Sequence, residues 1–564
     1  MTLTNRLIKI FLFSSTLLGS SFSVVKSYET LKNRSEPTHA TPHINNLIRN
    51  GSGQLNKNER DKLDEIGLRI LGNRITTMDP LLDQTYDTEH FRFYYTLQDN
   101  DAVENIDYVL TMGAIFEEVW SFYMDSIGFE FPPVNSDGLY EVRIENLPSF
   151  YFGYAVALGN GASCNSYIKM RNSYSGSQFS EHSEEENIKV TAVHEFFHAI
   201  QFDYNCFALD QSLWFLEATA VWSEDELYND INDLYRYMPS WFANPSKPIF
   251  ESSGIHMYGS FILFQYIDEH LGGRETIKNC WEASRELANP TTDVTFDAID
   301  AALEPFGLSF EDAYLRMRIA NRVLSNQTGA EPYTYQEAEA YREVVGDWGM
   351  PSGPPEAAFF FEKGNIETIR NSGLGLYESA YYLINTDDPV SLTGIELEGH
   401  TQLTSILKLR DSDEWTVRYG NQINIDPEIN LDWISLIVSP LGRDNNNWDW
   451  TIRISDGFSE DFTLFSPYPN PSIGELISID MQVINSQRIT TRIFDLAGRE
   501  IWSKIEEFNY PSLKTIQWNG INHNGRKVSN GIYFIVAEGI NQTDSRKIIY
   551  LKKMFLFQTL SDDL

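Results

Sequence analysis

The run Val190-Thr191-Ala192-Val193-His194-Glu195-Phe196-Phe197-His198-Ala199-Ile200-Gln201 decides how the central part of this chain folds. It contains no Gly or Pro and predicts a helix. A spacing of four residues places His194 and His198 one turn apart on one face, where both imidazoles can reach a single metal ion. Glu195 lies beside that face and can take a proton from an attacking water. Apolar residues cover the other faces and predict burial, and a bound metal would explain ionisable groups on a buried helix.

A candidate third ligand stands in the run 214–225, Trp-Phe-Leu-Glu-Ala-Thr-Ala-Val-Trp-Ser-Glu-Asp. This run predicts a second helix packed on the first, and Glu217 in it follows His198 by 19 residues. Catalytic zinc takes three protein ligands and leaves one position open, so we predict a Zn²⁺ site formed by His194, His198 and Glu217. Glu224 shares a face with Glu217 and can accept the free imidazole N–H of either histidine; an ordinary surface carboxylate is the alternative.

These residues resemble the gluzincin superfamily of metallopeptidases, in which an HExxH helix supplies two zinc ligands and a Glu the third. The sequence Trp214-Phe215-Leu216-Glu217-Ala218 is similar to the third-ligand motif of the aminopeptidase and thermolysin-like branches. Glu224 matches the aminopeptidase branch, whereas the thermolysin-like pattern has Asp where this chain has Val221. Residues 89–272 also resemble a poorly characterised family of secreted bacterial metalloproteases with a His-Glu-Phe-Phe-His-Ala-x-Gln helix and a Trp-x-x-Glu helix. The resemblance implies a zincin-type α+β metalloprotease domain.

The resemblance implies further roles around this centre. The aminopeptidase branch has a Tyr before a Gly and a long helix, and its hydroxyl stabilises the transition state. Tyr258, ahead of the predicted helix Gly259–Leu271, matches that position, and His256 is the weaker alternative. The Gly-x-Met-Glu-Asn string with which that branch recognises a free N-terminus does not occur in this sequence, which favours an endopeptidase. The predicted strand Tyr167–Met170 can bind a peptide substrate as an added strand.

The N-terminal 27 residues indicate an export signal. Arg6 and Lys9 precede the apolar run Ile10–Val25, and Ser21 and Ser23 offer a cleavage site. The alternative, a membrane anchor, needs about 20 apolar residues, more than this run provides. No other segment of the sequence is long and apolar enough to span a membrane.

Composition divides the rest of the chain into four parts. Residues 28–85 are a leader or prosegment with a helical pattern over Glu59–Leu71, and residues 86–350 form the predicted metalloprotease domain. Three prolines and two glycines between Gly349 and Pro355 indicate a linker. Residues 356–456 and 463–553 have only short strand patterns, so we predict two all-β sandwich domains after the α+β domain.

The last part resembles the C-terminal sorting domain of the type IX secretion system of Gram-negative bacteria. The resemblance rests on Pro467-Tyr468-Pro469-Asn470-Pro471, Phe494–Arg499, Ser529–Phe534 and the basic strand Arg546–Lys553. It implies export across the outer membrane, the type IX secretion machinery as a partner, and a product that is secreted or attached to the cell surface. The tail Met554–Leu564 departs from the family, and a carbohydrate-binding or spacer sandwich is the alternative.

The formal net charge of −37 makes nucleic acid and anionic membranes poor partners. Asp225 and Glu226 are predicted to be solvated. Cys164, Cys206 and Cys280 allow one disulfide. The first two flank the histidine helix in sequence, so we predict that they pair.

The predicted function is therefore that of a secreted zinc metallopeptidase, a hydrolase that cleaves peptide bonds with a metal-activated water. The alternative is a cell-surface binding or adhesion protein whose β domains act on an idle metalloprotease fold. The presence of Glu195 with all three predicted ligands favours the enzyme.

Overall fold

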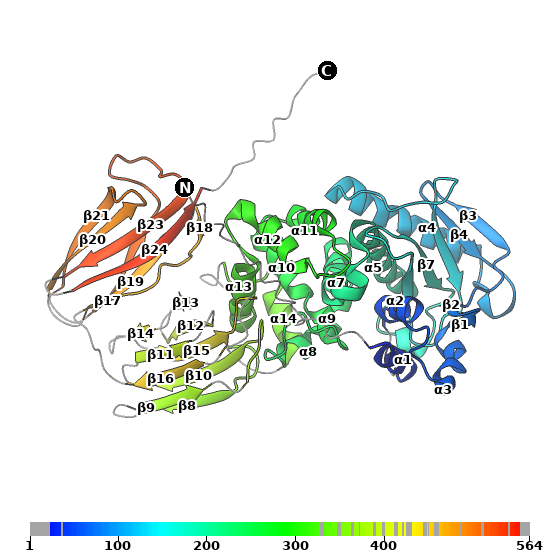
Figure 1. Cartoon of the computed structure of the whole chain (residues 1–564), viewed down its shortest axis with the longest axis horizontal. Helices are drawn as coiled ribbons and strands as arrows, with labels where there is room; N and C mark the ends of the chain where they lie inside the picture. The colour runs from blue at the N-terminus through cyan, green and yellow to red at the C-terminus, as the bar shows by residue number, and fades with distance from the viewer. Residues whose placement is uncertain are drawn as a thin grey trace, which may run out of the picture.

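The computed structural model describes residues 23–34, 36, 38–326, 332–346, 351–362, 366–370, 373–386, 391–397, 401–410, 415–419, 422–424, 431–443, 448, 450–455, 462–474, 476–483, 487–508, 512–539 and 542–552. The chain is multidomain, with a mixed α/β N-terminal region followed by two groups of β-sheets (Figure 1). Residues 1–22, which hold most of the predicted signal, and the tail Met554–Leu564 lie outside the described residues. In the described part, no helix combines the length and apolarity needed to span a membrane.

A mixed sheet with the strand order β3-β4-β5-β7-β6 carries the candidate site. Its strands are β3 (Gln84–Asp87), β4 (Phe91–Tyr95), β5 (Tyr140–Glu145), β6 (Gly153–Leu158) and β7 (Asn165–Arg171). Strands β4, β5 and β7 are parallel, and β3 and β6 close the two edges in antiparallel pairing. Because β7 is hydrogen-bonded on both sides, the prediction that Tyr167–Met170 adds a substrate strand is wrong, and the edge strand on that side of the sheet is β6.

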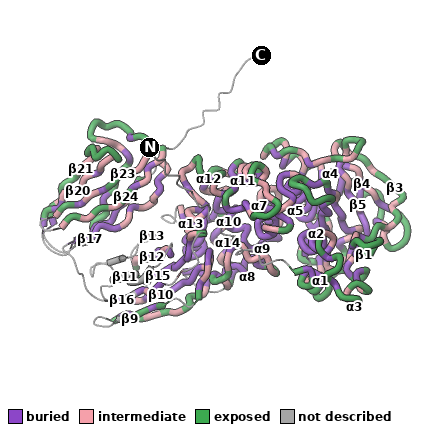
Figure 2. Tube along the Cα trace, in the orientation of Figure 1, coloured by how far each residue is buried: buried purple, intermediate pink, exposed green. Residues whose placement is uncertain are grey.

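Helices pack on this sheet and extend the core beyond it. Helix α4 (Ile106–Ser121) continues into a π-helical segment, Phe122–Ile127, and α5 (Glu184–Asn205) lies against β6 and β7. Figure 2, with buried residues in purple, shows the tube around α5 and α10 as largely buried. The remaining helices are α6 (Ala208–Gln211), α7 (Leu213–Tyr228), α8 (Met238–Phe242), α9 (His256–Gly259), α10 (Phe261–His270), α11 (Arg274–Leu287), α12 (Thr295–Leu303), α13 (Phe310–Val323) and α14 (Ala338–Val345).

The N-terminal segment forms a small unit of its own. It contains α1 (Val24–Lys32), α2 (Thr41–Asn50), α3 (Lys57–Arg60) and the hairpin β1 (Leu68–Leu71) to β2 (Arg74–Thr77). The prediction of a helical pattern over Glu59–Leu71 is wrong in its second half. Gly67 ends the helical turns at φ +77°, and the two-residue Gly72-Asn73 loop closes a hairpin.

The first group of β-sheets runs from β8 (Ala357–Phe361) to β16 (Trp450–Ser455). Its two sheets have the orders β13-β12-β15-β10-β8 and β14-β11-β16-β9, and residues of both share one apolar core. The other strands are β9 (Ile366–Arg370), β10 (Ala380–Thr386), β11 (Ser391–Leu397), β12 (Gln402–Leu409), β13 (Trp415–Tyr419), β14 (Gln422–Asn424) and β15 (Leu431–Ser439). The described end of the predicted linker is held in place, because the buried Arg322 guanidinium donates to the carbonyls of Pro351, Ser352 and Gly353.

The second group runs from β17 (Phe462–Leu464) to β24 (Thr543–Leu551), in sheets ordered β17-β19-β22 and β18-β24-β23-β20-β21. Alternate residues of β20 (Gln487–Asp495) are buried, as in a sheet with one face on a core. The intervening strands are β18 (Ser472–Ile473), β19 (Ile477–Val483), β21 (Glu500–Phe508), β22 (Ser512–Trp518) and β23 (Gly531–Glu538). A buried ion pair, Arg418 to Asp480 at 3.1 Å, joins the two groups.

Candidate metal centre

Two packed helices, α5 and α7, supply the predicted metal ligands. Helix α5 contains the predicted helical run Val190–Gln201 and starts before it at Glu184, because the Ser183 hydroxyl and the Glu186 side chain form a capping box there. Three acidic residues in its first turn favour the same start. The apolar faces of α5 are buried, as its sequence predicts, so His194 and His198 project from a rigid core helix.

The three predicted ligands converge. The Nε2 atoms of His194 and His198 lie 3.1 Å apart, and each lies 3.3 Å from a different carboxylate oxygen of Glu217. A tetrahedral zinc ion with bonds of about 2.0–2.1 Å separates its ligand atoms by about 3.3 Å. All three side chains are at most 1% exposed. The distances therefore match those of a single zinc-sized cation.

Hydrogen bonds on the far side of each ring decide which nitrogen faces the centre. The Nδ1 of His194 lies 2.5 Å from Glu224 Oε1, and the Nδ1 of His198 lies 2.7 Å from Gln201 Oε1. The amide of Gln201 is itself oriented, because its Nε2 donates to Leu216 O at 3.0 Å and to the Thr219 hydroxyl at 2.9 Å. Both Nδ1 atoms therefore carry the proton, and both Nε2 atoms present lone pairs.

The residues present fit a bound cation. Two imidazole lone pairs and a carboxylate face one another without a proton donor, and Glu217 Oε2 is buried with no hydrogen-bond partner. Contact with the His198 and His194 rings lowers the pKa of the Glu217 carboxyl despite its burial, and the Glu217 carboxylate in turn raises the pKa of His198. Burial and the adjacent His39 ring lower the pKa of His194 well below its usual range.

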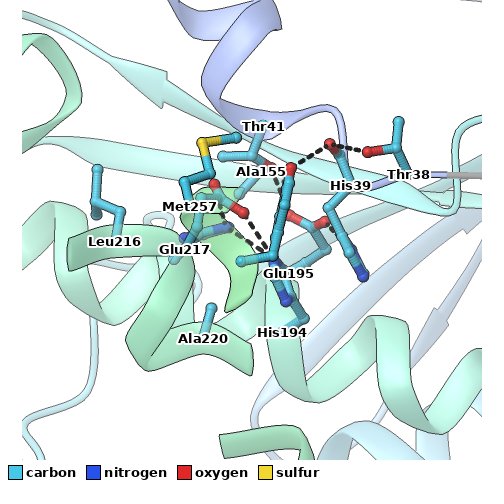
Figure 3. Close-up of polar contacts among 12 residues, drawn as sticks. Thr38, His39, Thr41, Ala155, His194, Glu195, Leu216, Glu217, Ala220 and Met257 are labelled. Carbon is cyan, nitrogen blue, oxygen red and sulfur yellow. Dashed lines mark hydrogen bonds and ion pairs between the residues drawn. The ribbon is translucent and has the colours of Figure 1, made fainter. Parts of the chain in front are cut away.

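Glu195 and Tyr258 approach the same centre and both meet His39. One ligand atom each of His39, His194 and Glu195 lies within 4.8 Å of the others. The carboxylate of Glu195 accepts from the Thr41 hydroxyl at 2.6 Å and from the Ala155 amide at 2.9 Å, and lies 2.9 Å from the His39 ring (Figure 3). The Tyr258 hydroxyl donates to the His39 carbonyl at 3.2 Å. Burial raises the pKa of the Glu195 carboxyl above its ordinary value.

The structure also places His256 and Asp225, two residues singled out in the sequence. His256 is buried and stacks on Trp241 with ring centroids 4.7 Å apart, and burial lowers its pKa to about 3. The prediction that Asp225 is solvated is wrong, since only 4% of it is exposed and carboxylates of α10 and of Glu337 gather around it. Glu226 is partly exposed and pairs with Arg274.

The predicted disulfide forms between Cys164 and Cys206. It ties the loop before β7 to the C-terminal end of α5, where the Cys164 amide also donates to Phe202 O and the Cys206 amide to Ala162 O. Cys280 is buried and free.

Sequence reasoning missed two residues of this centre, Gln201 and His39. Gln201 stands three positions after His198 on the same helix, a spacing that marks it as a ring partner. His39 lies 156 positions before Glu195, and no local pattern connects the two residues.

Comparison with known proteins gives two family matches. Residues 98–295, which include the metal centre, match a family of unknown function, DUF6055. Residues 466–551 match the secretion system C-terminal sorting domain. No curated protein matches the chain.

Several solved structures share short stretches with this chain. PorZ, a surface component of the type IX secretion system of Porphyromonas gingivalis, is 15% identical over 26% of this chain and 16% of its own (TM-score 0.14). Latent PorU of the same organism is 15% identical over 29% of this chain and 16% of its own (TM-score 0.16). A Bacteroides uniformis β-glucuronidase is 12% identical over 29% of this chain and 24% of its own (TM-score 0.15). The chain thus spans about a sixth of the first two structures and about a quarter of the third. Likeness at this level supports no functional inference.

The prediction of a type IX sorting domain is confirmed by the match over residues 466–551. The chain is therefore exported, to the cell surface or beyond it, and interacts with the type IX secretion machinery.

Proposed function

We propose that this protein is a secreted zinc-dependent peptidase. The observation that carries the proposal is the convergence of two imidazole nitrogens and the Glu217 carboxylate, at 3.1 to 3.3 Å from one another, beside the Glu195 carboxylate. A donor set of two His and one Glu is that of catalytic zinc in several peptidases, and it leaves a position for water or substrate.

A zinc ion held there would polarise a peptide carbonyl and lower the pKa of an attacking water. Glu195 takes the proton of that water and passes it to the leaving amine nitrogen, and burial, which raises the pKa of its carboxyl, makes it a stronger base. The Tyr258 hydroxyl donates a hydrogen bond to the oxyanion, as it now does to the His39 carbonyl. Glu224 and Gln201 hold the two imidazoles with Nε2 turned to the centre.

The position of β6 as an edge strand of the sheet supports cleavage within polypeptides. Strand β6 passes directly over Glu195, whose Oε2 accepts from the Ala155 amide of this strand. An extended substrate can pair with such an edge on both sides of the cleaved bond. We therefore favour an endopeptidase.

Replacing the base tests the proposal. In Glu195→Gln, zinc content is expected to be unchanged and hydrolysis of a mixed peptide library to fall at least ~100-fold, the usual contribution of a general base. Glu185→Gln, an exposed carboxylate on the same helix, is the matched control and keeps full activity. Both variants are assayed with and without chelator, as the intact chain and after cleavage near the exposed Leu81. Chelator-insensitive hydrolysis refutes the zinc-dependent mechanism, and no hydrolysis by either wild type or Glu195→Gln, cut or intact, refutes the peptidase and favours a surface-binding role.

A further inference from the structure

The candidate catalytic groups are covered by the chain's own N-terminal segment. Glu195 is 0% exposed and Tyr258 is 3% exposed. A site that cleaves polypeptides has to admit a polypeptide, so the cover is either a permanent layer of the fold or an occupant. The contacts of this cover with the site distinguish the two.

One residue of the segment, His39, engages both groups proposed to act on the substrate. Its ring lies 2.9 Å from Glu195 Oε1 and stacks on His194, with ring centroids 3.6 Å apart and planes 12° apart. Its carbonyl accepts the Tyr258 hydroxyl, as the carbonyl of a bound peptide would. Thr41 caps the other oxygen of Glu195. Together with the Ala155 amide, these contacts engage three of the about four acceptor positions of the Glu195 carboxylate, so a water would have to compete with the cover for the base.

The same segment also occupies the edge of β6. Thr38 pairs with the residues just before β6, through hydrogen bonds to Phe150 O at 2.9 Å and from the Phe152 amide at 3.0 Å, and the Ala40 amide donates to Gly153 O of β6 at 3.3 Å. Further along, Asn45 bridges the strand, with its amide donating to Ala155 O at 2.8 Å and its carbonyl accepting from the Ala157 amide at 2.9 Å. One continuous piece of chain thus satisfies the backbone groups that a substrate strand would use.

The cover is built as a separable unit. Val24–Thr77 has its own apolar cluster, which takes only a few residues from the catalytic region. Its connection to β3 passes through Leu81, which is 86% exposed. Beside Tyr258, a cavity of about 600 Å³ has Arg34 and Thr38 of the cover on one wall and Phe152 and Tyr237 on the other. Departure of the cover would open this cavity toward Glu195.

We infer that Tyr28–Thr77, the part of this unit that follows the predicted export signal, is a resident inhibitor, which occupies the polypeptide groove along β6 and leaves before the site can bind a substrate. That the segment inhibits an enzyme rests on the proposed function, but its occupation of the groove can be tested by itself. The natural trigger would be cleavage of the exposed stretch around Leu81 by a second protease.

The test uses the full chain, loaded with zinc, with a site-specific protease sequence inserted between Leu81 and Leu82. A peptidyl hydroxamate, which binds metal in a peptide groove, is titrated before and after the cut. We expect at least ~10-fold tighter binding after the cut, together with release of the N-terminal fragment in size-exclusion chromatography. Equal binding before and after, with zinc retained, overturns the inference. Release of the fragment only when the rest of the chain unfolds also overturns it, because the segment is then a permanent layer.

Point variants separate specific blocking from loss of stability. In the uncut chain, His39→Ala combined with Thr41→Val is expected to tighten hydroxamate binding at least ~10-fold, since removing one hydrogen bond to a charged group has about this effect. Asn56→Ala removes the exposed cap of α3 without touching the groove and is expected to change nothing. Equal tightening by both variants, or none by either, is evidence against the inference. Hydroxamate binding after the cut without any hydrolysis would refute the peptidase and leave the resident inhibitor standing.

Discussion

The hydrogen bond between His198 and Gln201 gives a quantitative test of the metal centre. In Gln201→Leu, the Nδ1–H of His198 stays buried without an acceptor, which costs about 1–3 kcal/mol. Loss of such an orienting partner weakens metal binding about 10- to 100-fold. At about 1.36 kcal/mol per decade, this range is about 1.4–2.7 kcal/mol, so the two estimates agree. We therefore expect the Kd for zinc to rise by one to two decades.

The assay is competition for zinc against a chromophoric chelator, with thermal unfolding recorded on the same samples. Gln265→Leu is the matched control, because this glutamine is 5% exposed, lies on α10 and bonds to Glu269 rather than to a ligand. Both variants lose stability, but only Gln201→Leu loses zinc affinity. A change in Kd below about threefold, or an equal change in the control, would refute the assigned ring orientation.

Two further predictions concern stability. The Cys164–Cys206 disulfide spans 42 positions, for which loop entropy gives a stabilisation of about 4 kcal/mol. The double variant Cys164→Ser with Cys206→Ser should therefore lower the free energy of unfolding by about that amount. In denaturant titrations, reductant should destabilise the wild type equally, and a loss below about 1 kcal/mol would contradict the estimate. Burial and neighbouring carboxylates raise the pKa of Asp225 to about 8, so the folded chain holds a proton there that the unfolded chain releases near pH 4. The stability that protonated Asp225 contributes is complete below pH 4 and is lost as the pH rises through 8. The Tm of wild type should therefore fall more between pH 5.5 and 8.5 than the Tm of Asp225→Asn. Parallel curves of Tm against pH would show that Asp225 ionises normally.

The parts of the site that were predictable from sequence are those set by helix geometry. A spacing of four residues on one helix fixes the His194–His198 pair wherever the helix packs, and the motif around Glu217 predicts the second helix. The partner of His194 follows in the same way, since Glu224 lies two turns after Glu217. The burial of Asp225 was not predictable, because it depends on carboxylates that arrive from α10 and from Glu337.

For the strands too, local patterns were predictable from sequence, whereas contacts between distant segments were not. The short strand patterns over Leu403–Leu409 and Trp433–Val438 lie within β12 and β15. Which strand is free was not predictable, because pairing order depends on contacts distant in sequence. Tyr167–Met170 has the pattern of a strand but is the interior neighbour of β6. The role of His39 depends on that order too, since its segment docks on the edge that β6 leaves open.

Burial of the centre needs an explanation that also accounts for its ligand count. A structural zinc site is closed by four protein ligands, whereas the described group that includes Glu217 consists of two histidines and one glutamate, and His39 joins His194 only in a second group with Glu195. A site with three ligands, a carboxylate base and a tyrosine hydroxyl is arranged to receive a fourth group from outside. In this structure, the residues that reach the base and the hydroxyl are His39 and Thr41, from a unit with its own core and an exposed connection. We infer that the centre is buried by its occupant, and that the catalytic fold itself leaves it open.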